Sequence, residues 1–233
     1  MSASYTQVLE GGHTLAARVS PEEMCSRLQR LYVAAVSDVL DDHGLWHQVM
    51  DGIFPLAMQM SMAGIAFTAL GHAERSTDRS IRLGARMVDE LFPQAVPVVA
   101  CSGDTTVGHW GELLTNGAIV RGAVGAVLDG GVRDCRAILD LNFPVFCRFR
   151  SARDAKGRWN IVEMNNPVVC GGVTVHSGDI IFGDCDGVVV IPQAIAEDVL
   201  YEAEETARVE NEIRSRVRQG EKVGDLYLSY QRF

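Results

Sequence analysis

Three residues in the middle of the chain have types and spacing that could do chemistry. Glu112 precedes Arg133 and Asp134 with twenty residues between, and Asp129-Gly130-Gly131 forms a turn just before the pair. In open α/β sheets, ligands gather where strands end and helices begin. At such a place helix amides favour anions, arginine grips carboxylates, and aspartate holds hard cations. The pattern therefore indicates a site for an anionic ligand and a divalent cation.

Local sequence around these residues predicts the elements that would position them. Glu112 begins a short helix that Gly122 would end, because glycine readily adopts the backbone that closes a helix. The small and β-branched run 123–128 predicts a buried strand, and 135–141 predicts a second helix. A plainer interpretation stays open on spacing alone. Arg133-Asp134 would then be a surface pair, and Glu112 an acid stabilised by the helix dipole.

The full pattern resembles a known family of enzymes. Glu112-x20-Arg133-Asp134 is similar to the acid-x20-Arg-Asp signature of the 4-hydroxy-4-methyl-2-oxoglutarate / 4-carboxy-4-hydroxy-2-oxoadipate aldolases. These are class II pyruvate aldolases, grouped with the regulator of ribonuclease E activity A. The resemblance extends over about 31–217 and includes three further stretches, 143–146, 166–173 and 178–192. It departs at 92–97, where family members usually have a Pro-Gly-Asp turn.

The resemblance implies an α/β fold: a single swivelling β/β/α (RraA-like) domain over 1–233, with mixed sheets and flanking helices. An arm at 1–19 would precede it, and a C-terminal helix would cover about 193–219. Family members assemble as trimers or as dimers of trimers, so a homotrimer or homohexamer is expected.

The resemblance also implies roles for individual residues. Asp134 would hold Mg²⁺ or Mn²⁺, largely through waters, and Arg133 would bind the pyruvate end of a 2-oxo acid. The backbone of Gly111, Glu112, Leu113 and Leu114 would complete the cradle, and the Glu112 side chain would order water on the metal. Glu210, supplied by a neighbouring subunit, corresponds to the base of the family. An ordinary helical pair between Glu210 and Arg214 is an equal alternative.

The lysines bear on the type of aldolase. Such an enzyme stabilises a pyruvate enolate through either a lysine Schiff base or a divalent metal. The chain has only Lys156, in a charged loop, and Lys222, after the last long helix. Neither has the apolar surroundings that lower a lysine pKa. The lysines thus favour the metal route, and the resemblance implies a metal-dependent lyase that releases pyruvate, with oxaloacetate decarboxylase activity beside it.

Composition excludes several other classes. The 233 residues carry a net charge of −9, which argues against nucleic acid as a partner. No apolar run is long enough for a membrane span, and no export signal opens the chain. The six cysteines lack zinc-site spacing, so a reduced, cytoplasmic protein is expected.

Elsewhere, strands are predicted at 60–70, 95–101, 144–150, 161–170, 173–175, 180–182 and 188–191, and a helix from Ser20 to about Tyr32. A polar segment, 72–86, predicts another helix. Four arginines would line one face of that helix, as a solvated face, an oligomer contact or an anion-binding patch: Arg75, Arg79, Arg82 and Arg86.

Several alternatives remain. A protein-binding regulator of ribonuclease activity would share the fold. The stretch 171–176 is similar to the phosphohistidine motif of phosphoenolpyruvate-utilising enzymes, but the sequence after it differs. His109 could assist proton transfer or be structural. Three aspartates suggest a metal site, although turn formation explains them better: Asp179, Asp184 and Asp186.

Overall fold

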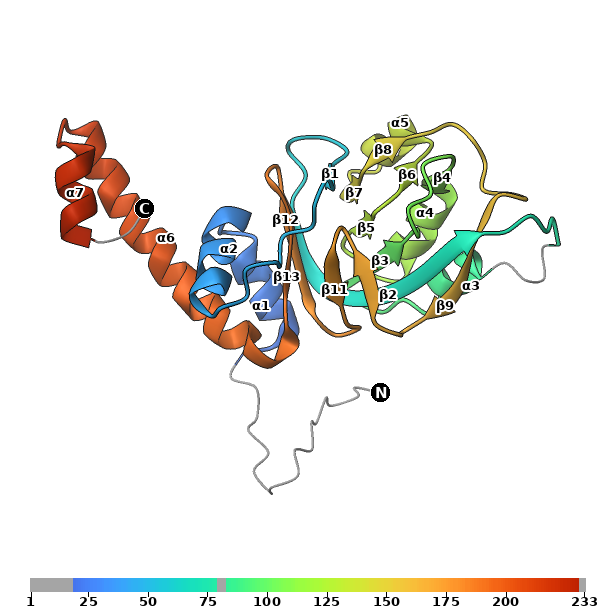
Figure 1. Ribbon diagram of the computed structural model, residues 1–233, viewed down its shortest axis with the longest axis horizontal. Helices are drawn as coiled ribbons and strands as arrows, with labels where there is room; N and C mark the ends of the chain where they lie inside the picture. Colours follow the sequence, from blue (N-terminus) through green and yellow to red (C-terminus); the bar gives the residue numbers. More distant parts are fainter. Residues whose placement is uncertain (1–18, 79–82, 231–233) are drawn as a thin grey trace, which may run out of the picture.

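The computed structural model describes residues 19–78 and 83–230 (Figure 1). Within these residues, eight strands form the main sheet, in the order β1-β7-β5-β3-β2-β12-β13, with β9 also paired to β2. Neighbours among β2, β3, β5 and β7 are parallel, whereas β12, β13, β1 and β9 join antiparallel. The strands are β1 Phe54–Pro55, β2 Met62–Ala73, β3 Ala95–Ala100, β5 Ala126–Leu128, β7 Val145–Cys147, β9 Trp159–Met164, β12 Ile180–Asp184 and β13 Gly187–Ile191.

A small parallel sheet positions the candidate site. It contains β4 Gly108–Trp110, β6 Gly131–Val132 and β8 Phe149–Arg150, in that spatial order. Each of these strands follows a parallel strand of the main sheet along the chain: β4 follows β3, β6 follows β5, and β8 follows β7. The chain therefore leaves the main sheet three times at the same edge. A separate hairpin pairs β10 Val168–Cys170 with β11 Val173–Val175.

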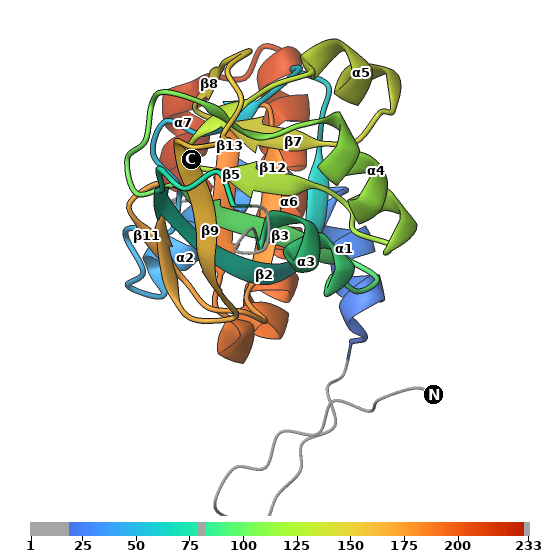
Figure 2. The same cartoon turned by 90° about the vertical axis from the view of Figure 1, so that its right-hand side faces the viewer.

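Helices cover the main sheet on two sides (Figures 1 and 2). One group, α1 Pro21–Leu28, α2 Val33–Asp42 and α6 Ala196–Arg218, packs against β12 and β13 through buried residues such as Leu40, Phe182 and Val199. The other group is α3 Gly84–Asp89, α4 Glu112–Val120 and α5 Cys135–Asp140. A single 3-10 turn, Gln193–Ile195, precedes α6, and α7 Val223–Tyr230 follows it.

The observed fold confirms the predicted α/β class with mixed sheets and flanking helices. Local signals account for much of it. Ser20 accepts a hydrogen bond from the Glu23 amide at 3.1 Å and caps α1, as its position before Pro21 predicts. Every residue of β3 is buried, as expected for a parallel strand covered on both faces.

Some predicted elements were wrong. The helix predicted at 72–86 is wrong over most of the described range: β2 continues to Ala73 and pairs there with β9, and residues 74–78 are not helical. The start of α3 is the described helical part of that range. Arg75 therefore lies outside any helix, Arg86 lies in α3 and pairs with Glu90 at 2.8 Å, and Arg79 and Arg82 fall outside the described residues. The single strand predicted at 161–170 is two strands, separated where Asn165 adopts a left-handed backbone.

The buried side chain of His109 links two strands of the small sheet, β4 and β6. Its side chain is fully buried in β4, and Nδ1 accepts a hydrogen bond from the Gly131 amide of β6 at 2.9 Å. Its Nε2 lies 3.3 Å from Asp104 Oδ1 but out of hydrogen-bonding alignment. Burial lowers the pKa of His109, partly opposed by the Asp104 carboxylate. His109 is therefore a neutral structural tie rather than an exposed proton donor.

This tie predicts pH-dependent stability. The folded-state pKa of His109 is lowered, so the unfolded chain binds the extra proton first, near pH 6.5. The free energy of unfolding should therefore fall as the pH drops from 7 towards 5. Protonation also removes the Nδ1 acceptor that holds Gly131. In His109→Asn, whose amide oxygen can replace Nδ1, this fall should be smaller, by up to about 1.4 kcal/mol per pH unit.

Urea unfolding at a series of pH values measures the effect. His47→Asn is the matched control, because His47 is an exposed histidine outside any helix or strand. Identical pH slopes for the wild-type protein and His109→Asn would contradict the structural role.

Candidate functional site

Arg133 and Asp134 lie where β6 ends and α5 begins. Asp134 is the residue before α5 and has a left-handed backbone, with φ of 56°. Aspartate tolerates this conformation better than most residues with a side chain. The turn directs the Asp134 carboxylate back across the small sheet, towards the start of α4.

The turn between β4 and α4 lies directly against this carboxylate. The Arg133 amide donates to the Trp110 carbonyl at 2.9 Å, which holds the two turns side by side. A methyl group on Gly111 would lie 2.7 Å from Asp134 Oδ2 and 3.0 Å from Arg133 Cγ. Only glycine leaves room for this approach. The Glu112 amide then points to Asp134 Oδ2 at 3.4 Å, so the structure brings Gly111, Glu112, Arg133 and Asp134 together.

The first turn of α4 offers its amides at this place, whereas its side chains point elsewhere. Glu112 bonds to the Asn116 side-chain amide, one turn further along α4. Leu113 is exposed, and Leu114 packs against the core. The buried Thr115 hydroxyl accepts the Trp110 indole N–H at 2.8 Å. The polar residues of this helix thus have structural partners.

Arg133 lies between two acids. Its Nε is 3.5 Å from Asp134 Oδ1, and its Nη1 is 3.2 Å from Asp154 Oδ1. All three side chains are partly exposed. Two carboxylates therefore face one guanidinium, so a bound cation would meet a favourable local charge. Sequence reasoning missed Asp154, because nothing in its charged loop indicates contact with Arg133.

Glu210 lies far from this group within one chain. It is in the second half of α6, on the side of the molecule opposite to α4 and α5 (Figure 1). It pairs with Arg214 at 3.7 Å and accepts the Tyr32 hydroxyl. Glu210 also borders a cavity of about 460 Å³ between α6 and the start of α7, with Ile213, Val217 and Val223.

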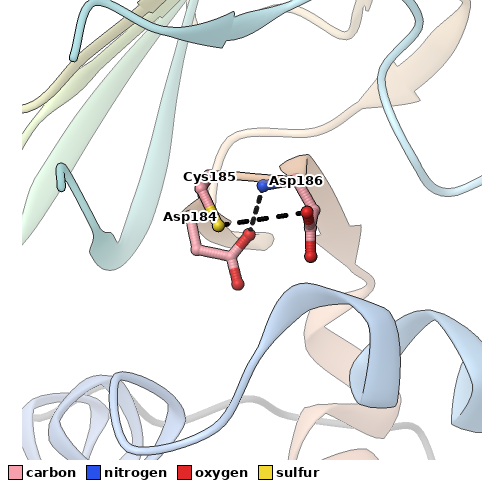
Figure 3. A group of neighbouring side chains, drawn as sticks. All are labelled: Asp184, Cys185 and Asp186. Atoms are coloured by element: carbon pink, nitrogen blue, oxygen red, sulfur yellow. Dashed lines mark hydrogen bonds between the residues drawn. The ribbon is translucent and has the colours of Figure 1, made fainter. Parts of the chain in front are cut away.

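A second acidic group lies at the turn between β12 and β13 (Figure 3). Asp184, Cys185 and Asp186 place potential ligand atoms within 4.8 Å of one another. Both oxygens of Asp184 are already engaged, by the Val33 amide at the start of α2 and by the Asp186 amide, each at 2.9 Å. Asp179 likewise accepts the His176 and Gln193 amides. These hydrogen bonds agree with the interpretation of the aspartates as turn residues.

Other possible nucleophiles lack suitable surroundings. All six cysteines are free thiols, and burial raises the pKa of both Cys25 and Cys147 to about 11. Lys156 and Lys222 are both exposed, so neither has the apolar pocket that a Schiff-base lysine requires. In the residues that the structure describes, no helix is both long and apolar enough to cross a membrane.

Comparison of the sequence and the structure with known proteins identifies a family. A "Putative 4-hydroxy-4-methyl-2-oxoglutarate aldolase" of Halalkalibacterium halodurans is 40% identical over 127 residues, which are 54% of this chain and 60% of that relative. Among solved structures, an uncharacterized protein from Pseudomonas syringae pv. tomato has a TM-score of 0.83 and 27% identity, covering 94% of this chain and 99% of that one.

A third similar protein carries a different description. Streptomyces coelicolor RraAS2, described as an unusual member of the RNase ES inhibitor RraA family, has a TM-score of 0.77 and 26% identity, with coverage of 85% and 100%. The RraA-like family model, described as Aldolase/RraA, matches residues 33–190, which contain β4, α4, β6 and α5. The chain therefore belongs to the Aldolase/RraA family.

Proposed function

We propose that the chain is a divalent-metal-dependent lyase that cleaves a 4-hydroxy-2-oxo acid into pyruvate and a second carbonyl compound. The observation that supports this most is the close approach of Arg133 and Asp134 to Gly111 and the first amides of α4. A cation ligand, a carboxylate-binding guanidinium and helix amides meet there at one exposed edge. The aldolase name of a 40% identical relative is consistent with that chemistry.

The residues present fit a hard cation. Among the described residues, Asp134 makes long contacts only, 3.4 Å to the Glu112 amide and 3.5 Å to Arg133, so its carboxylate has no strong partner there. A single protein carboxylate suits Mg²⁺ or Mn²⁺, which keep several waters as ligands. When bound, the cation would stabilise the negative charge that develops as the carbon–carbon bond breaks. The same stabilisation would permit oxaloacetate decarboxylation as a side activity.

The protein's own groups have separate tasks in this proposal. Arg133 binds the carboxylate of the 2-oxo acid through its guanidinium N–H groups. The amides of Glu112, Leu113 and Leu114 face the same anion at the positive end of α4. The Glu112 side chain, held by Asn116, orders water beside the site.

Glu210 requires a second copy of the chain in order to act. Within one chain, Glu210 lies far from Asp134. We therefore place Glu210 at the site of a neighbouring subunit, where it takes the proton of the substrate's 4-hydroxyl group. Exposed apolar side chains support assembly: Leu113 and Val120 on α4 are 82% and 83% exposed. A homotrimer or homohexamer is the proposed assembly, and a reducing cytoplasm is the proposed location.

A non-catalytic regulator of ribonuclease activity is the second candidate. It is favoured by the similarity to RraAS2, which extends over the whole length of that protein. Pyruvate release decides between the two, because a regulator has no need of it.

The catalytic proposal predicts the behaviour of two variants. Arg133→Ala and Asp134→Asn should each lower kcat/KM for pyruvate release by roughly 100-fold or more. Asparagine retains the left-handed backbone of residue 134, so Tm should change by less than about 3 °C. EDTA should abolish turnover, and Mg²⁺ or Mn²⁺ should restore it. The measurement is a pyruvate-coupled assay over a panel of 4-hydroxy-2-oxo acids.

Asp140→Asn is the matched control, since Asp140 is exposed at the other end of α5. Activity that survives chelation, or a pyruvate adduct trapped by borohydride, would refute the metal-dependent mechanism.

The shared-site proposal predicts complementation between inactive variants. Glu210→Gln and Asp134→Asn should each be nearly inactive alone. Differently tagged copies, co-expressed and purified as mixed assemblies, should recover about one quarter of wild-type activity, because random mixing restores that fraction of sites. Glu210→Gln with full activity would instead leave Glu210 as the ordinary partner of Arg214.

A further inference from the structure

The loop 151–158 supplies an acid, Asp154, that has no part in the reaction proposed above. It follows β8 and passes beside the turn that carries Arg133. Its Asp154 places Oδ1 3.2 Å from Arg133 Nη1. The Asp154 carboxylate thus already contacts the Arg133 guanidinium, the group that we propose binds the substrate carboxylate.

Backbone hydrogen bonds hold this loop against the site. The Ser151 amide donates to the Val132 carbonyl, one residue before Arg133, at 2.9 Å. The Arg153 carbonyl accepts the Gly108 amide at the start of β4, also at 2.9 Å. The Arg153 guanidinium reaches the Thr106 carbonyl at 3.2 Å. Both strands that form the site therefore fix the residues immediately before Asp154.

The far side of Asp154 is fixed as well. Arg158 donates to the Asp154 carbonyl at 3.0 Å, and the Trp159 amide donates to the Ala155 carbonyl at 2.9 Å. Trp159 is buried in the core at the start of β9. The backbone on both sides of Asp154 is consequently held beside the site, which keeps the carboxylate within reach of Arg133.

The contact limits how Arg133 can bind another anion. A two-point grip on a carboxylate uses two guanidinium nitrogens. Asp154 engages Nη1, while Nε faces Asp134. An end-on grip, through Nη1 and Nη2, therefore brings a substrate carboxylate into competition with Asp154 for Nη1. Since the Asp154 side chain is 56% exposed, water screens the pair and displacement remains easy.

We infer that Asp154 is an intramolecular stand-in for the substrate carboxylate and sets the affinity for the 2-oxo acid by competing for Arg133. This inference rests on the proposed function, in which Arg133 binds that carboxylate. If Asp154 instead held Arg133 in position for the substrate, removing the Asp154 charge would weaken pyruvate binding and raise KM.

The test is direct binding of pyruvate, by calorimetry at saturating Mg²⁺, to the full-length chain and its variants. Asp154→Asn should bind pyruvate roughly two- to fivefold more tightly, the range expected for an exposed ion pair. In turnover, KM should fall by a similar factor while kcat does not decrease. On an Arg133→Ala background, Asp154→Asn should have no effect, because the competition is gone.

Asp89→Asn is the matched control. Asp89 forms an exposed pair with Arg121 at 2.9 Å, between α3 and the end of α4, and its loss should leave pyruvate binding unchanged. Equal or weaker binding by Asp154→Asn, with wild-type binding intact, overturns the inference alone. A wild-type chain that neither binds nor releases pyruvate overturns the proposed function, and this inference with it.

Discussion

The candidate site depends on one close approach between two turns. The Asp134 carboxylate occupies the space that a side chain at position 111 would fill, 2.7 Å from where its first carbon would lie. This requires glycine at 111, a left-handed backbone at 134, and parallel alignment of β4 with β6. The steric condition therefore ties together positions 111 and 134, which are 23 residues apart in sequence.

Buried hydrogen bonds keep those turns in place. His109 joins β4 to the Gly131 amide of β6, and Thr115 joins the first turn of α4 to the Trp110 indole. Both side chains lie inside the protein, where water cannot compete for their partners. The candidate site residues on the exposed turns are thus supported by buried polar contacts beneath them, which hold a site on turns firmly.

Sequence predicted the elements whose signals are local. Glu112 begins α4, Gly122 follows its end, and α6 lies within the helix expected after Pro192, because caps and apolar stripes act over a few residues. Contacts between distant segments were not predictable in this way. The pairing of β2 with β9 takes up the first residues of a predicted helix, and the approach of Asp154 to Arg133 joins a loop to a turn. The helix α7 was also missed, since its eight residues have only a weak apolar pattern.

The backbone at Asp134 has a consequence for how members of this fold diverge. Glycine, asparagine and aspartate adopt a left-handed backbone most readily, and only aspartate among these carries a negative charge. Replacement by either neutral residue would remove the carboxylate that we propose as the cation ligand, while the architecture persists. At position 134, substitution can therefore remove the negative charge more easily than it can disrupt the turn. A lineage of enzymes with such a turn can give rise to binding proteins in one substitution, without first rebuilding its scaffold.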